Sequence, residues 1–492
     1  MLLVADLDLT RKNFFGHSFL AMLIWNAGTT WWIWNSTSVG SVAAIAANAL
    51  LMCLPWWGYV VFKEKFGRKA GYFSLIAFWM AFEFIHLNWQ LSWPWLSLGN
   101  VFASQPDWVQ WYEYTGIGGG TLWVLLVNVL VYDWMFGGEG KSKKSKVTKA
   151  ISITILLLSP ILFSKLIELA NLNFKEFKRQ VVIIQPNIDP YEKFESGTTA
   201  QQIQTHLNLT RSAIDSNTKL IIWPETALSA NTEISNVENV PDYRPVFEFL
   251  QQHPNTTLLS GIETYRLYGT EKPSSPYARK TGDGVYYDSY NAAVSIKHGE
   301  PLQFYIKSKL VPGVETLPSF LNFMGPVFEK FGGTTGGYAM DTSSIAFKNN
   351  GNPYITAPII CYESIYGEYV ASYVQKGANI LTIMTNDGWW GNTPGHKQHL
   401  DYARLRAIET RRWIARSANT GISAVIDNYG NIVSTQPWDK PAVIKYNIPV
   451  TSRETFYVKY GDYLYRFFSL LAGILLLWNL FIVAKKKLSR SK

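Results

Sequence analysis

The stretch Pro358-Ile359-Ile360-Cys361-Tyr362-Glu363-Ser364 ends an apolar run with a cysteine. A short run of apolar and β-branched residues predicts a buried strand, so we expect Cys361 at the carboxyl end of a strand. The other cysteine of the sequence, Cys53, lies in a long apolar segment, and the two are a poor disulfide pair. An isolated cysteine in such a place is more often a small buried hydrophobe. A free thiol there is nevertheless a candidate nucleophile.

An acid and an amine precede this cysteine in similar settings. Glu225 follows an apolar run in Trp223-Pro224-Glu225-Thr226, and Lys307 stands in Tyr305-Ile306-Lys307-Ser308. Glu225 and Cys361 directly follow β-rich runs, and in a parallel sheet such positions gather at the carboxyl ends of the strands. A cation lowers the pKa of a thiol, and a carboxylate can remove its proton. Each residue alone would more often be structural; the three together indicate an acyl-thioester enzyme.

Short apolar runs alternate with helix-like stretches from residue 181 onward, which predicts an α/β domain with interior strands buried on both faces. The expected strands are 181–185, 220–223, 257–262, 291–296, 354–361, 380–385 and 423–426. The expected helices are 199–216, 243–252, 368–376 and 399–418. The apolar, glycine-rich segment 317–338 is expected to be either a flexible lid that touches lipid or a loop packed on the core of its own domain.

The remainder of the chain has the composition of a membrane protein. Hydrophobic residues make up 48% of the sequence and charged residues 16%. Much of the net charge of +9 lies in three clusters beside apolar runs, which indicates cytoplasmic loops rather than a surface for nucleic acid. These clusters are 63–69, 141–149 and 485–492. A bilayer span needs about 20 apolar residues, and the runs that reach this length are 14–34, 42–62, 72–91, 119–136, 150–169 and 463–483.

The basic clusters also predict how the chain is organised. If they are cytoplasmic, residues from about 170 to 460 lie on the outer side of the membrane. We therefore expect a multi-span domain of about five helices at 1–170, an extracytoplasmic catalytic domain at 171–460, and a last span with a basic tail at 461–492. Glu83 falls within the third span, where an ionisable group is costly and is expected to have a partner.

The motifs around the three site residues resemble the Glu-Lys-Cys site of the nitrilase superfamily. They are Trp-Pro-Glu-Thr at 223–226, Tyr-x-Lys-x-x-Leu-Val-Pro-x-x-Glu at 305–315, and Cys-Tyr-Glu at 361–363 followed by Thr-Asn-Asp-Gly-Trp-Trp-Gly at 385–391. With membrane spans before and after, nearly the whole chain resembles the apolipoprotein N-acyltransferase family, bacterial enzymes that complete lipoprotein acylation. The resemblance implies a nitrilase-like α-β-β-α sandwich domain inserted between transmembrane helices.

The resemblance also implies roles for individual residues. Glu225 matches the general base, Lys307 the catalytic lysine and Cys361 the nucleophile. Supporting roles fall to three further residues, which are Glu315, Tyr362 and Glu363. The chain departs from the family at 313–314, where Gly-Val stands in place of Phe-Gly, and at Phe194, where the family typically has Trp. The family usually has eight spans, so the resemblance would place two more before Met1.

The function implied by the resemblance is a ping-pong acyl transfer. By analogy with the family, the donor would be a membrane phospholipid, phosphatidylethanolamine, and the acceptor the N-terminal diacylglyceryl-cysteine of an apolipoprotein. No metal, cofactor or nucleic acid is expected, and we expect a monomer in the bacterial inner membrane with the catalytic domain on the periplasmic side. Two alternatives remain open: a membrane-tethered nitrilase-type amidohydrolase, in which water resolves the thioester, and a non-enzymatic scaffold.

Two other groups of residues call for an interpretation. His396 and His399 have a helical spacing that would suit a metal, but the sequence offers no matching carboxylate cluster, which favours structural roles. Several arginines follow on the same expected helix, and we expect them on a solvated face or paired with Glu409. They are Arg404, Arg406, Arg411, Arg412 and Arg416.

Overall fold

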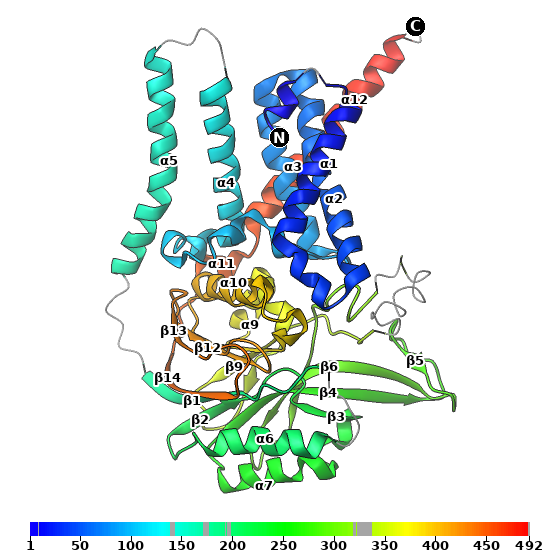
Figure 1. The fold of residues 1–492 in the computed structure, drawn as a ribbon, viewed down its shortest axis with the longest axis vertical. Helices are drawn as coiled ribbons and strands as arrows, with labels where there is room; N and C mark the ends of the chain where they lie inside the picture. Colours follow the sequence, from blue (N-terminus) through cyan, green and yellow to red (C-terminus); the bar gives the residue numbers. More distant parts are fainter. Residues whose placement is uncertain are drawn as a thin grey trace. The chain divides into compact units, whose positions relative to one another are not determined.

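The computed structural model describes residues 1–7, 9–137, 143–170, 177–191, 193, 198–317, 321 and 337–490. Phe194 and most of the segment 317–338 lie outside the described residues. The chain divides into two compact units, each drawn in Figure 1. The helical unit contains Met1–Trp31, Ser41–Ile167 and Tyr460–Lys492, and the sheet unit contains Trp32–Gly40 and Glu168–Lys459.

Long helices build the helical unit. They are α1 (Arg11–Thr30), α2 (Ser38–Phe66), α3 (Arg68–Asn88), α4 (Tyr112–Phe136), α5 (Lys143–Ala170) and α12 (Tyr463–Arg490). Within the described residues, five helices are long and apolar enough to cross a membrane, namely α2, α3, α4, α5 and α12. The first predicted span does form α1, but this helix is not among the five, because polar residues such as Asn26 and Thr30 are spread along it.

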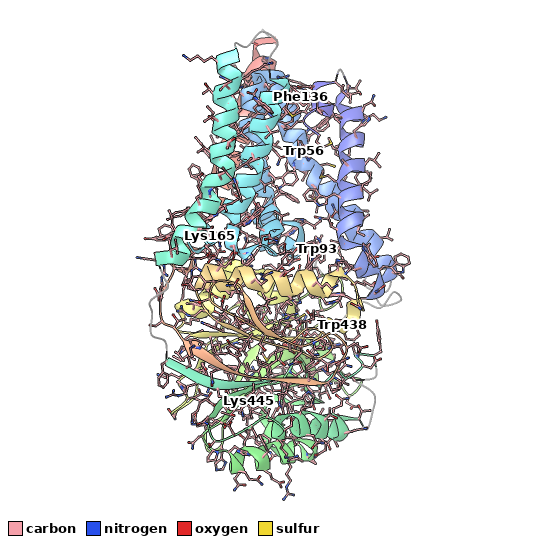
Figure 2. The ribbon with its side chains drawn as sticks, turned by 60° about the vertical axis from the view of Figure 1, so that its left-hand side comes forward. Trp56, Trp93, Phe136, Lys165, Trp438 and Lys445 are labelled. Atoms are coloured by element: carbon pink, nitrogen blue, oxygen red, sulfur yellow. The ribbon has the colours of Figure 1, made fainter. Side chains whose placement is uncertain are left out.

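Aromatic side chains pack the first three of these helices together. Trp56 of α2, labelled in Figure 2, meets Trp79 of α3 edge-on with ring centroids 6.0 Å apart. Trp79 also stacks on Trp25 of α1 at 6.3 Å. Offset and edge-to-face contacts at these separations are favourable for aromatic pairs. Trp79 therefore lies at a point where α1, α2 and α3 meet.

Glu83 of α3 has the partners that a buried carboxylate needs. One of its oxygens accepts hydrogen bonds from Trp79 Nε1 at 2.9 Å and from the Leu98 backbone N–H at 2.8 Å. The other accepts from the hydroxyls of Thr121 and Tyr465, each at 2.7 Å. Thr121 belongs to α4 and Tyr465 to α12, so this carboxylate joins three helices. The prediction that Glu83 has a partner is confirmed.

Two sheets form the centre of the sheet unit. The first runs β14-β1-β2-β4-β6-β5, with β3 on β4 and β7 on β6; the second runs β13-β12-β11-β10-β9-β8. The strands of the first sheet are β1 (Phe177–Gln185), β2 (Thr218–Ile222), β3 (Leu228–Glu233), β4 (Thr257–Gly269), β5 (Arg279–Lys280), β6 (Tyr286–Ile296), β7 (Gln303–Ile306) and β14 (Ala442–Val450). Those of the second are β8 (Phe347–Lys348), β9 (Ile355–Ile360), β10 (Ile380–Thr385), β11 (Ile414–Ala418), β12 (Ala424–Ile426) and β13 (Ile432–Thr435).

Four helices cover the two sheets on their outer faces (Figure 1). They are α6 (Thr199–Arg211) and α7 (Arg244–Gln252) on the first sheet, and α9 (Gly367–Gln375) and α10 (Pro394–Thr410) on the second. Alternation along β1 explains this layering, because successive side chains of a strand point to opposite faces. Val181 and Ile183 pack between the sheets, whereas Val182 and Ile184 pack with α6 and α7. The predicted α-β-β-α sandwich is confirmed.

The predicted helix 399–418 is wrong in its second half. Helix α10 ends at Thr410, where Arg411 takes a left-handed conformation with φ 50°. The chain then enters β11, which pairs in parallel with β10. The sequence pattern around these residues suits a helix, but the ladder with β10 satisfies the backbone and buries every residue of β11.

The arginines of this region are mostly buried, so the prediction of a solvated helix face is wrong. Arg406, Arg411, Arg412 and Arg416 are each no more than 3% exposed. The alternative prediction, pairing with Glu409, is confirmed for Arg406, whose Nε lies 2.7 Å from a carboxylate oxygen of Glu409. Buried arginines are paired as a rule, and these residues contribute to the interior rather than to a charged surface.

Candidate active site

The predicted acid, amine and thiol each follow a strand, which the sequence indicated for Glu225 and Cys361; the strands belong to two sheets rather than to one. Glu225 comes after β2, Lys307 directly after β7 and Cys361 directly after β9. Gly261 of β4 allows the chain at Glu225 to approach closely. A Cβ atom at Gly261 would lie 2.6 Å from the Glu225 Cα and 2.4 Å from the backbone nitrogen of Thr226. A side chain at position 261 would therefore displace the turn that carries Glu225.

Lys307 lies between two carboxylates. Its Nζ is 3.1 Å from Glu225 Oε1 and 2.7 Å from Glu315 Oε1, and the lysine side chain is only 1% exposed. Asn291 Nδ2 donates to the same two oxygens, at 2.8 and 3.1 Å. Burial by itself would lower the pKa of Lys307, but the two carboxylates raise that pKa well above its usual value. Lys307 is therefore an ammonium ion, and Asn291, to which the sequence analysis gave no role, completes the cluster.

Further hydrogen bonds hold Glu225 in place. Its second carboxylate oxygen accepts from the backbone N–H of Asn386 at 3.1 Å. Its backbone carbonyl accepts from Nζ of Lys193, a buried lysine, at 2.7 Å. Burial lowers the pKa of Lys193 to about 8, although the charges of Glu225 and Glu263 oppose the change. Both the carboxylate and the main chain of Glu225 are thus fixed.

Cys361 has a strained backbone and a thiol that keeps its proton. Its φ of 49° lies in the left-handed region, which costs a residue with a side chain about 1–3 kcal/mol. Burial raises the pKa of the Cys361 thiol, the charge of Glu225 raises it further, and the ammonium of Lys307 opposes both. The resting thiol is therefore protonated, and the charges of Glu225 and Lys307 both act on it.

Glu363 joins the segment after β7 to the turn after β9. Its side chain is fully buried and accepts three backbone hydrogen bonds, from Ser308 at 2.7 Å, Lys309 at 3.2 Å and Ile360 at 2.8 Å. The Tyr305 hydroxyl donates a fourth at 2.5 Å. Burial raises the pKa of Glu363 to about 7, and these hydrogen bonds act against the rise. Glu363 thereby fixes the chain that carries the lysine against the chain that carries the cysteine.

The other two predicted supporting residues lie in the same region. Glu315 accepts from the Val311 backbone N–H at 2.8 Å through the oxygen that does not face Lys307. Tyr362 is buried beside the nucleophile, and its ring meets that of Tyr366 edge-on at 5.4 Å. Tyr362 therefore has a packing role in this structure, in addition to the backbone N–H that it places after the thiol.

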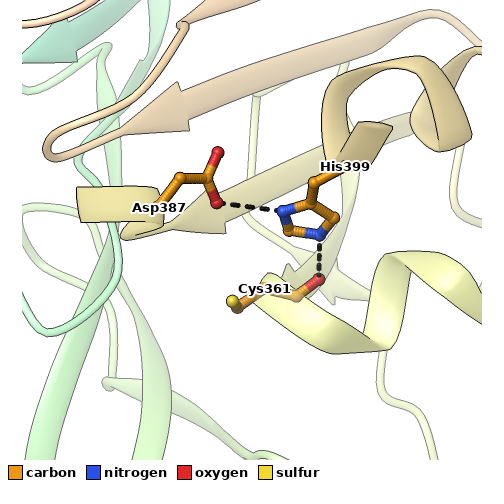
Figure 3. Close-up of side chains that lie close together, drawn as sticks. All are labelled: Cys361, Asp387 and His399. Atoms are coloured by element: carbon orange, nitrogen blue, oxygen red, sulfur yellow. Dashed lines mark hydrogen bonds and ion pairs between the residues drawn. The ribbon is translucent and has the colours of Figure 1, made fainter. Parts of the chain in front are cut away.

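A second buried cluster touches Cys361 from the other side. His399 Nδ1 lies 2.9 Å from Asp387 Oδ1, and His399 Nε2 lies 3.2 Å from the Cys361 carbonyl oxygen. Figure 3 shows that this carbonyl, rather than the sulfur, faces the imidazole. Asp387 also pairs with Arg416 at 2.5 Å, and this ion pair lowers the pKa of Asp387 although burial alone would raise it.

This cluster corrects the sequence analysis, which found no carboxylate near the histidines. Cys361, Asp387 and His399 place potential metal-ligand atoms within 4.8 Å of one another. Their donor set is already engaged, because Asp387 accepts from Arg416 and both ring nitrogens of His399 face oxygen atoms. We therefore describe the group as a hydrogen-bonded cluster. The feature of the sequence that could have indicated this cluster is the position of Asp387, two residues after the predicted strand 380–385.

Comparison with known proteins agrees with the motifs. Residues 1–130 match the family model of the apolipoprotein N-acyltransferase N-terminal domain, and residues 180–456 match that of carbon-nitrogen hydrolases. An apolipoprotein N-acyltransferase of Chlorobaculum tepidum is 31% identical over 477 residues, which cover 94% of this chain and 87% of that protein. One of Geobacter metallireducens is 26% identical over 468 residues, which cover 92% and 84%. With its nitrilase-like sheet unit and its apolar helices, the chain belongs to the apolipoprotein N-acyltransferase family.

Proposed function

We propose that the chain moves an acyl group from a membrane phospholipid to Cys361, and from there to the α-amine of diacylglyceryl-cysteine at the N-terminus of an apolipoprotein. The chain is an acyltransferase of lipoprotein maturation and a multi-pass bacterial membrane protein, as its family and its five apolar helices indicate. The observation that carries the chemistry is the ammonium of Lys307 held between Glu225 and Glu315 beside the thiol.

The first half-reaction forms a thioester. As the sulfur of Cys361 attacks the ester carbonyl of the phospholipid, its proton passes to Glu225. The ammonium of Lys307 stabilises the negative charge that develops on the carbonyl oxygen, a contribution that is large in a site closed to water. The ester C–O bond then breaks, and Glu225 returns the proton to the leaving alkoxide of the lysophospholipid.

The second half-reaction forms an amide. The α-amine of the apolipoprotein attacks the thioester carbonyl, Glu225 takes a proton from the nitrogen, and the C–S bond breaks. The thiolate of Cys361 then recovers this proton from Glu225, which restores the resting state. A thioester is higher in free energy than an amide, so the transfer needs no further energy source.

The finer assignments are also part of this proposal. We assign phosphatidylethanolamine as donor, a monomer as the working form, and the bacterial inner membrane with the sheet unit on the periplasmic side as the location. The basic clusters at 63–69, 141–149 and 485–492 support this orientation, since positively charged loops stay in the cytoplasm. A lipid donor and a lipid-linked acceptor both suit a site tethered to spans that precede and follow it in the chain.

One experiment separates this function from a membrane-tethered amidohydrolase. Purified protein is incubated with labelled phosphatidylethanolamine, and the acyl-enzyme is detected as label released by neutral hydroxylamine. A diacylated lipopeptide is then added. We expect labelled lipopeptide, and no labelling of Cys361→Ser. Absence of a thioester would refute the proposal, and a thioester that decays to fatty acid while ignoring the amine would favour the hydrolase.

A further inference from the structure

The backbone of the proposed nucleophile needs an explanation. Cys361 holds a left-handed φ of 49°, and a residue with a Cβ leaves that conformation unless its surroundings hold it. Its carbonyl oxygen accepts from the Ser364 hydroxyl at 2.8 Å and faces His399 Nε2 at 3.2 Å. Ser364 lies within the same short helix, Cys361–Ile365, and moves with it. His399 comes from α10, so its contact ties the Cys361 carbonyl to another element.

The hydrogens available in the cluster determine the state of His399. The single hydroxyl hydrogen of Ser364 is donated to the Cys361 carbonyl, so the Ser364 oxygen, 2.9 Å from His399 Nε2, acts there as an acceptor. His399 Nε2 thus faces two acceptors and must carry a hydrogen. His399 Nδ1 faces Asp387 Oδ1 at 2.9 Å, and Asp387 is an ionised carboxylate because it pairs with Arg416. Arg416 Nη2, which can only donate, also lies 3.3 Å from Nδ1, so an acceptor and a donor both face this nitrogen.

The partners of Asp387 fix the histidine in turn. Asp387 Oδ1 accepts from the Thr385 hydroxyl at 2.8 Å, in addition to His399, and its other oxygen accepts from Arg416. These side chains are completely buried; Thr385 ends β10, Asp387 follows it by two residues, and Arg416 lies in the middle of β11. Thr385 also forms a hydrogen bond with the Cys361 thiol. The cluster therefore contacts Cys361 both at its carbonyl oxygen and at its sulfur.

We propose that His399 is a positioning residue that is anchored by Asp387 through Nδ1 and holds the carbonyl of Cys361 through Nε2, so that the thiol faces Lys307 and Glu225. This inference rests on the proposed role of Cys361 as nucleophile. It adds a residue that touches neither the acyl chain nor the reacting atoms. Without His399, the turn at Cys361 relaxes from its left-handed conformation, and the sulfur moves away from the positive charge of Lys307.

The test measures the reactivity of Cys361 without any lipid. The rate of alkylation by iodoacetamide at one pH is followed by mass spectrometry of the Cys361 peptide, which separates it from Cys53. His399→Leu removes both ring nitrogens and their contacts, and we expect alkylation to slow about tenfold or more, as for loss of a buried charge-assisted hydrogen bond. His399→Gln restores one donor and should react at least about three times faster than His399→Leu. The matched control, His396→Gln on the same helix, should stay within about twofold of the unchanged protein, since its ring stacks on Trp438 outside the cluster.

For each variant, the thermal unfolding temperature in detergent is measured together with the alkylation rate. A purely structural role would lower the unfolding temperature and leave the alkylation rate of the folded protein unchanged. Alkylation of folded His399→Leu at the unchanged rate would overturn the inference, and so would equal slowing by Leu and Gln. If His399→Leu does not fold, Asp387→Asn replaces it, with an expected slowing of about threefold or more, and an unchanged rate again overturns the inference. Failure of phospholipid to form a thioester would refute the proposed function and leave these rates untouched.

Discussion

Replacing Lys307 tests the proposed chemistry most directly. Its Nζ lies 2.7 Å from Glu315 and 3.1 Å from Glu225, at the centre of a buried cluster. At an effective dielectric constant of about 20, each of these ion pairs has a Coulomb energy of about 5–6 kcal/mol. The cost of burying the charges offsets most of this gain, and removing one partner of a buried pair costs about 3–5 kcal/mol in practice.

Lys307→Met leaves two carboxylates around the amide of Asn291 with no cation between them. We expect one of them to bind a proton, because like charges this close cannot both remain ionised. The variant would then lose the oxyanion donor, worth about 10²–10³ in rate, and part of the general base as well. Since such effects are not additive, we expect thioester formation to slow by about 10³.

The assay is a single turnover with labelled phospholipid, quenched and scored as label released by neutral hydroxylamine. Lys309→Met is the matched control, because Lys309 lies two residues along and its Nζ sits over the rings of Tyr366 and Tyr369, at 5.2 and 5.5 Å from their centroids. Loss of such cation–π contacts costs about 0.5–1 kcal/mol in stability, and we expect at most about a threefold change in rate. A Lys307→Met rate within tenfold of the unchanged protein, or an equally slow Lys309→Met, would refute the reasoning.

Three further substitutions test other parts of the structure. Asn291→Leu removes the amide that donates to Glu225 and Glu315, and single-turnover thioester formation should slow by about 10–100-fold; a change confined to the unfolding temperature would contradict this role. Burial raises the pKa of Glu363 to about 7 from 4.5, so between these values the folded chain holds a proton that the unfolded chain has lost. Stability therefore falls as pH rises through this window, by at most about 1.4 kcal/mol per pH unit, and Glu363→Gln should flatten the slope of the unfolding free energy; equal slopes would count against the shift. Glu83→Leu removes the acceptor of four hydrogen bonds in the helical unit, and thermal unfolding in detergent should show a loss of about 2–3 kcal/mol, whereas an unchanged transition would show that the network contributes nothing.

The strand ends were the predictable part of this protein. The runs before Glu225 and Cys361 are apolar and β-branched, and such runs form buried strands whatever their partners. The rule that side chains gather at one edge of a parallel sheet does not apply here as expected, because Glu225 follows β2 of the first sheet and Cys361 follows β9 of the second. The structure places Glu225 within reach of Lys307, at 3.1 Å, although β7, which precedes the lysine, is a short strand at the side of the first sheet.

What the sequence did not reveal depends on long-range pairing. The region 399–418 has the pattern of one long helix, and only its ladder with β10 makes its second half a strand. That change moves Arg416 from an expected solvent-facing position to the interior, where it pairs with Asp387. The cluster behind Cys361 could not be predicted without it, because an isolated histidine or aspartate on either element has a more ordinary explanation. Glu363 was easier to identify, since it lies two residues after the proposed nucleophile, Cys361, in the sequence.

The resting protonation of Cys361 suits the compartment that we propose for the sheet unit. A thiolate is the form that oxidants attack, and the periplasm is an oxidising environment. Burial and the negative charge of Glu225 both raise the pKa of the thiol, so little thiolate exists while the site is empty. The same carboxylate accepts the proton once an acyl carbonyl offers the sulfur a bond and Lys307 can stabilise the new charge on oxygen. In the proposed mechanism Glu225 thus protects the nucleophile at rest and activates it in the reaction, and its contacts with Lys307 and Asn386 keep it in position for both.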